Sequence, residues 1–107
     1  MRLHDRFEWD EGKADANARK HGVTFDQAAE VLLDEDGDGY HLEEYDEVHG
    51  VEEDRFITTA SHPALRELVL VIAWTERDSD SGPVTRIISA RRATKTEKDR
   101  YESEIRG

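Results

Sequence analysis

The sequence predicts an α+β domain in which helices pack on a mostly antiparallel, meandering sheet, and three observations support this fold class. The longest apolar run, Leu68–Trp74, has the composition of a central strand that is covered on both faces. Capping-box patterns, which mark helix starts, occur at Thr24–Gln27 and at Thr94–Glu97. The polar segment Asp78–Pro83 separates two strand-like stretches, as the loop of a hairpin does. The predicted order is strand, helix, helix, antiparallel strands, helix.

Local signals place the elements in the first half of the chain. Phe7 and Trp9 alternate with polar residues and would share one face of a short strand. Asp10 is a favourable helix N-cap, and Gly22 suits the left-handed position after a helix. Thr24 opens a second helix with an apolar side. We therefore expect a strand at 6–9, helices at 10–21 and 25–33, and a weak strand or a loop at 40–48.

The acidic turn Asp34–Gly39 imitates the start of a calcium-binding EF-hand loop, with aspartates at alternate positions. Position 12 of that loop would be Tyr45, where a bidentate glutamate is needed. No clear helix follows. The sequence therefore predicts a solvated turn here, with no metal and no cofactor.

Strand signals dominate the second half of the chain. β-Branched residues precede a turn at Ser61–Ala64, the long apolar stretch follows, and a second β-branched stretch comes after the hairpin loop. Glu97 and Tyr101 lie one turn apart and would share a face of the last helix. We expect strands at 53–60, 65–77 and 84–93, and a helix at 94–106.

Charge and composition limit the function. At 107 residues the chain has the size of one domain, spanning residues 1–107. The net charge is −11, yet Glu30–Asp54 holds 12 of the 26 acids and no lysine or arginine, which leaves the remainder at +1. A basic surface outside this segment is therefore compatible with the composition. The chain has no cysteine and no apolar run near the roughly 20 residues of a membrane span, so we expect a cytoplasmic protein without membrane contact.

Two polar groups are candidates for function. The strand that carries Arg86, Ser89, Arg91 and Arg92 leads into a helix N-terminus, which favours anions. This arrangement suits a phosphate-binding edge, but the same arginines could simply pair with the many carboxylates. One face of the first helix carries a polar stripe that is either functional or merely a solvated face with cations at the helix end. Its members are Lys13, Asn17, Lys20 and His21.

The motifs together resemble the BrnT family. The resemblance covers Phe7–Asp10, Lys13, Asn17, Lys20–Val23, Phe25, Ala28, Glu53–Arg55, Trp74–Arg77, Arg86–Thr94, Glu97 and Tyr101. The family usually has a glycine shortly after the Glu-x-Arg pair, where this chain has Thr59, Ala60 and Ser61. The resemblance implies a RelE-like fold and a small ribonuclease toxin of a type II toxin–antitoxin system, which cuts RNA and arrests translation. It also implies a BrnA-like ribbon–helix–helix antitoxin as partner. The toxin would associate with operator DNA only through this antitoxin.

RNA cleavage without a metal needs a base for the 2′-hydroxyl, cations for the phosphorane and an acid for the leaving 5′-oxygen. Arg55, Arg77 and Arg91 lie on successive predicted strands and could converge on one phosphate if their faces agree. His21 has a suitable unperturbed pKa, and Glu53 is the alternative base. Candidate RNA-binding residues are Lys13, Lys20, Arg86, Ser89, Arg92 and Tyr101.

Two other interpretations of the acidic segment remain open. It could be the working surface of a non-catalytic interaction module that binds a basic protein partner, or it could reflect adaptation to a saline cytoplasm.

Overall fold

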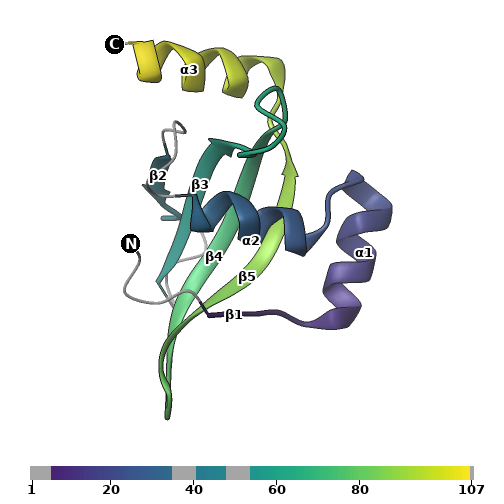
Figure 1. Cartoon of the computed structure of the whole chain (residues 1–107), viewed down its shortest axis with the longest axis vertical. Coiled ribbons are helices and arrows are strands. Elements are labelled where there is room, and N and C mark those ends of the chain that lie inside the picture. The colour runs from purple at the N-terminus through teal and green to yellow at the C-terminus, as the bar shows by residue number, and fades with distance from the viewer. Residues whose placement is uncertain (1–5, 35–40, 48–53, 107) are drawn as a thin grey trace.

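A five-stranded mixed sheet and three helices form the domain, in a computed structural model that describes residues 6–34, 41–47 and 54–106 (Figure 1). The spatial strand order is β1-β5-β4-β3-β2. Every neighbouring pair is antiparallel except β1 and β5, which run parallel. The α+β prediction is thus confirmed. The elements are β1 (Phe7–Glu8), α1 (Glu11–His21), α2 (Phe25–Leu33), β2 (Leu42–Tyr45), β3 (Arg55–Ser61), β4 (Val69–Ser79), β5 (Gly82–Arg92) and α3 (Lys95–Arg106).

The helices begin and end where the capping signals predict. Asp10 accepts a hydrogen bond from the Lys13 backbone N–H at 2.9 Å, and Gly22 closes α1 with φ 69°, a left-handed conformation that suits glycine. Thr24 and Gln27 form a reciprocal capping box at the start of α2. None of the helices within the described ranges is long and apolar enough to cross a membrane.

The strand boundaries differ from the predictions in three places. β1 pairs over two residues only. β4 begins at Val69 instead of Leu65, because Leu68 closes a turn by donating to the Leu65 carbonyl and accepting from the His62 N–H. The hairpin strands extend to Ser79 and resume at Gly82, so the loop is shorter than expected. The stretch predicted as a strand or loop at 40–48 contains β2, and the EF-hand-like turn lies outside the described residues after Asp34.

One face of the sheet, which we call the covered face, packs against α2 (Figure 1). It bears Thr58 and Ala60 of β3, Ile72 of β4, and Ile87 and Ala90 of β5, all buried. Buried apolar residues of α2, including Phe25, Val31 and Leu32, belong to the same core cluster. Burial of this apolar surface is the main source of stability in a domain of this size.

A β-bulge in β5 sets which side chains share a face. Ser89 pairs with Ala73 while Ile87 pairs with Trp74, so Ile88 is an extra residue between the two pairs. Strict alternation would place Arg86 and Arg91 on opposite faces. Because the bulge adds one residue, both arginines project from the face opposite to the covered face, which we call the open face.

Asn17 of α1 substitutes for a neighbouring strand at the edge of β5. β1 pairs with β5 only at Thr85 and Arg86. Farther along β5, the Asn17 carboxamide accepts from the Ala90 N–H at 3.1 Å and donates to the Ala90 carbonyl at 2.7 Å. It also donates to the Val23 carbonyl at 3.0 Å. Asn17 is only 8% exposed, so these bonds satisfy backbone groups that water does not reach.

Glu8 ties the short strand β1 to the sheet. Its carboxylate accepts from Nε and Nη2 of Arg77 at 2.8 and 2.5 Å, and from Nη1 of Arg86 at 2.8 Å. Hydrogen bonds from Arg77 and then from Arg86 lower the pKa of Glu8 from 4.5 to about 2.

We predict that Asn17→Ala lowers the free energy of unfolding by about 2–4 kcal/mol, because it leaves buried backbone groups of Ala90 and Val23 without partners. Chemical denaturation measures this change. Arg19→Ala, at an exposed position of the same helix, is the control and should change stability by less than about 0.5 kcal/mol. Equal effects of the two substitutions would contradict the role given to Asn17.

A second prediction concerns acid stability. The ionised Glu8 carboxylate stabilises the fold fully above its unfolded pKa of 4.5, and this contribution is lost as the pH falls toward the folded value of about 2. Glu8→Gln should therefore be less stable than the wild type at pH 7, with a difference that shrinks between pH 4.5 and pH 2. Urea unfolding across this pH range measures the difference, with the exposed Glu67→Gln as control. A pH-independent difference would refute the assignment.

Candidate functional site

A hollow of about 230 Å³ on the open face brings together residues from strands that are distant in sequence. Arg55 of β3, Ser89 and Arg91 of β5, and Asp46 after β2 line it. The other lining residues are apolar: Ile57, Val71, Ala73 and Ile88. The register explains this grouping, because Ile57, Ala73 and Ser89 form one cross-strand row and Thr59, Val71 and Arg91 form the next.

A smaller hollow of about 130 Å³ continues the first one toward α3. The two share Ile57, Val71 and Arg91, so Arg91 stands at their junction. The smaller hollow adds Glu97 and Arg100 of α3, which lies across the end of the sheet (Figure 1). Arg100 forms an ion pair with Glu44 of β2.

Arg91 is held by a two-pronged ion pair with Glu97. Its Nη1 and Nη2 donate to the two carboxylate oxygens at 2.6 and 2.8 Å. The hydrogen bonds from Arg91 are the main reason that the pKa of Glu97 falls from 4.5 to about 2. Burial opposes this change, and the hydrogen bond from the Thr94 backbone adds to it. The same ion pair raises the pKa of Arg91. Both groups are therefore charged at neutral pH, as an arginine that binds phosphate must be.

Arg77 and Arg86 also project from the open face but lie outside the two hollows. They share the Glu8 carboxylate near the hairpin end of the sheet. Arg77 is six residues along β4 from Val71, the partner of Arg91, which separates the two rows by about 20 Å. The expected convergence of three arginines on one phosphate is therefore wrong for Arg77, whereas Arg55 and Arg91 do line one hollow.

The remaining predicted site residues are placed as follows. Lys13 and Lys20 are exposed on α1, and His21, at the end of that helix, is half-buried. Arg92 pairs with Leu70 of the covered face, so alternation directs it away from Arg91. Glu53 lies outside the described residues.

Tyr101 belongs to the core instead of the surface. It is 2% exposed, and its hydroxyl accepts from the Ser61 N–H at 3.3 Å. A side chain that is this deeply buried has no surface to offer to RNA, so the structure gives Tyr101 a packing role that anchors α3.

Sequence reasoning missed Asp46 as a site residue. Its backbone N–H donates to the Arg55 carbonyl at 2.8 Å, which continues the β2–β3 ladder and carries its side chain to the hollow. The only signal in the sequence was that Asp46 lies within the stretch 40–48, which was predicted as a weak strand or a loop. Among residues 6–34, 41–47 and 54–106, no three His, Asp or Glu side chains gather as metal ligands.

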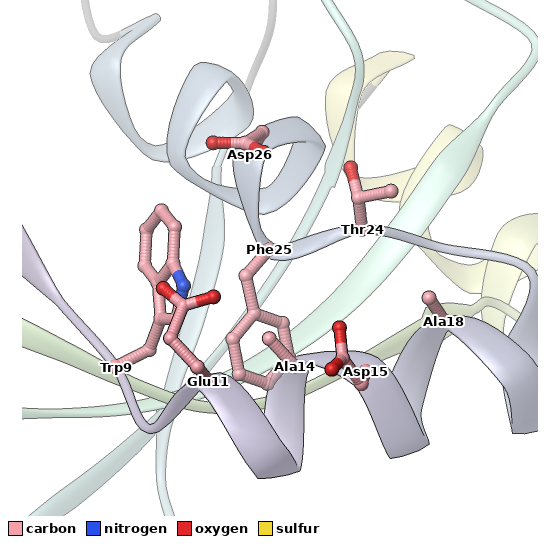
Figure 2. A pocket seen from close by; sticks show the side chains of 8 residues that line it. All are labelled: Trp9, Glu11, Ala14, Asp15, Ala18, Thr24, Phe25 and Asp26. Carbon is pink, nitrogen blue, oxygen red and sulfur yellow. The ribbon is translucent and has the colours of Figure 1, made fainter.

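A third hollow, of about 280 Å³, lies between α1 and α2 and has the opposite charge (Figure 2). Trp9 and Phe25 form its apolar wall, with ring centroids 5.9 Å apart. Glu11, Asp15 and Asp26 line it as well. These carboxylates repel phosphate, so a polyanion is favoured at the open face and not here.

Comparison with known proteins assigns the family. The model of a family described as "Ribonuclease toxin, BrnT, of type II toxin-antitoxin system" matches residues 9–97. No curated protein matches the chain. The match covers most of the chain, including every described residue of the hollow on the open face. The chain therefore belongs to the BrnT family of ribonuclease toxins of type II toxin–antitoxin systems.

Proposed function

We propose that this protein is an endoribonuclease that inhibits translation by cutting RNA without a metal, at the hollow on the open face. The observation that carries the proposal is that Arg55, Ser89 and Arg91 line one hollow although they come from two separate strands. Guanidinium groups in a partly sheltered site stabilise the charge that develops on a phosphodiester during cleavage. Family membership supplies the reaction class. A RelE-like topology is part of the same proposal.

In the proposed reaction, the 2′-oxygen of RNA attacks the adjacent phosphorus while a base removes its proton. The P–O5′ bond breaks, and the departing 5′-oxygen takes up a proton. The products are a 2′,3′-cyclic phosphate and a 5′-hydroxyl end. Arg91 and Arg55 bind the non-bridging oxygens, and the exposed Ser89 hydroxyl supplies a further hydrogen bond to the phosphate.

Three residues are candidates for the base. Asp46 is favoured by its place in the hollow with both arginines. His21 and Glu53 stay predictions from the sequence, as do the RNA contacts of Lys13 and Lys20 on α1 and of Arg86 beside Glu8. Arg77 is assigned to the structural ion pair with Glu8.

The proposed partner is a BrnA-like ribbon–helix–helix antitoxin, which the type II family membership supports in general terms. The antitoxin covers the toxin and binds the operator DNA, and the toxin reaches DNA only through it. The proposed site of action is the cytoplasm, where RNA is translated.

We predict that Arg91→Ala and Arg55→Ala each lower RNA cleavage by about 100-fold or more, because each removes a cation from the transition state. Cleavage of a labelled RNA by the purified protein, in a chelator, measures the loss. Relief of growth arrest in cells that lack the antitoxin provides a second readout. Arg66→Ala removes an arginine that pairs with Asp34 elsewhere on the surface, and it should retain full activity.

Mapping of the RNA ends tests the chemistry. We expect 5′-hydroxyl and 2′,3′-cyclic phosphate ends, and no cleavage when the antitoxin is added in excess. Folded Arg91→Ala and Arg55→Ala proteins that cut RNA as fast as the wild type would show that the site lies elsewhere. Loss of wild-type activity in the chelator would refute the metal-independent reaction.

A further inference from the structure

Glu97 performs two separate functions at the start of α3. As part of the capping box, it accepts from the Thr94 N–H at 2.8 Å while the Thr94 hydroxyl accepts from the Glu97 N–H at 3.2 Å. A capping box requires nothing more of the carboxylate. Here the same group also receives both Nη atoms of Arg91. The second function is not needed to start a helix.

The geometry of this ion pair leaves one edge of Arg91 available. The Nη1–Nη2 edge faces Glu97, and Nη1 also donates to the Arg92 carbonyl at 3.3 Å. Among the described residues, Arg91 Nε has no hydrogen-bond partner. The Nε–Nη2 edge of a guanidinium is a fork that binds two oxygens of one phosphate.

Arg77 shows the opposite arrangement. Its Nε and Nη2 both donate to Glu8, so its fork is occupied by a carboxylate of its own chain. Glu8 therefore holds Arg77 away from a ligand, whereas Glu97 holds Arg91 by the other edge. Arg91 also stands at the junction of the two hollows, with Glu97 only in the smaller one.

We propose that Glu97 is a positioning residue of the ribonuclease site, which fixes the Arg91 guanidinium so that its free edge serves the RNA phosphate. A long arginine side chain loses considerable rotamer freedom when it binds a ligand. Glu97 removes that freedom before RNA arrives, which lowers the cost of reaching the transition state. This inference rests on the proposed function and adds to it that α3 is part of the active site.

Two substitutions separate the functions of Glu97. In Glu97→Gln, the side-chain oxygen still accepts from the Thr94 N–H, so the capping box survives. The neutral amide has one oxygen and cannot accept from both Nη atoms, so the two-pronged ion pair with Arg91 is lost. Thr94→Ala does the reverse, because it removes the hydroxyl acceptor of the capping box and leaves the Arg91 ion pair in place.

We expect Glu97→Gln to lower RNA cleavage by roughly 10- to 100-fold with little change in melting temperature. Thr94→Ala should lower the melting temperature and leave cleavage unchanged at a temperature where all variants are folded. Glu104→Gln, the same chemical change at an exposed position of α3, is the matched control and should leave both unchanged.

A double substitution tests whether Glu97 acts through Arg91. In an Arg91→Lys background, which keeps the charge but has no fork, Glu97→Gln should change cleavage by no more than about twofold. A full-sized effect in that background, or wild-type cleavage by Glu97→Gln, would overturn the positioning role and leave the ribonuclease proposal intact. Absence of cleavage by the wild-type protein would overturn both.

Discussion

The hydrogen bonds between Asn17 and both backbone groups of Ala90 are the interaction on which the arrangement of the site depends. A carboxamide offers one acceptor and a donor in the same geometry as a peptide group, so Asn17 completes the edge of β5 where β1 has already ended. Ala90 is fully buried on the covered face. Its two neighbours, Ser89 and Arg91, are consequently directed to the open face, and α1 is fixed against the same strand.

The bulge at Ile88 acts together with this contact. It lies directly before Ser89, and it changes the alternation of β5 so that Arg86, Ser89 and Arg91 all project from one face. Bulges commonly direct side chains next to functional sites. In this protein the bulge determines which arginines of β5 share a face, and the Asn17 contact fixes the edge of the strand that carries them.

The distribution of charge explains how a strongly acidic protein can expose arginines on one face of its sheet. Three arginines of the open face pair with acids from elements at its periphery: Arg77 and Arg86 with Glu8 of β1, and Arg91 with Glu97 of α3. Arg100 of α3 pairs in the same way with Glu44 of β2. These pairs limit self-repulsion among the cations. The pairs also make the arginines unequal as anion binders. The Nε–Nη2 edge of Arg77 is occupied by Glu8, whereas Glu97 binds Arg91 through Nη1 and Nη2. The hollow between α1 and α2 is lined by three carboxylates, which repel anions (Figure 2).

Local chemistry made much of the fold predictable. The helix ends were predicted correctly from their capping residues, because a cap involves only residues within one turn. These capping residues are Asp10, Gly22, Thr24 and Thr94. The apolar run of β4 correctly predicted the central strand, which lies between β5 and β3 in the sheet. The expectation that this strand is covered on both faces was wrong, because Val71 and Ala73 line the hollow on the open face. The phosphate-binding role of the arginine-rich stretch before α3 stays a prediction from the sequence.

Only the tertiary structure decided which of these residues meet. Nothing in the sequence assigned Asn17 a different role from Lys13 and Lys20 in the polar stripe of α1. The hydrogen-bond partner of Asn17 is Ala90, which is 73 residues away in the chain. The bulge has no sequence signature of its own, so alternation alone would have assigned Arg86 to the wrong face. Caps and apolar periodicity are local properties that the sequence determines by itself. Strand register and long-range ion pairs arise from contacts between distant segments, so they are settled only when the sheet has formed.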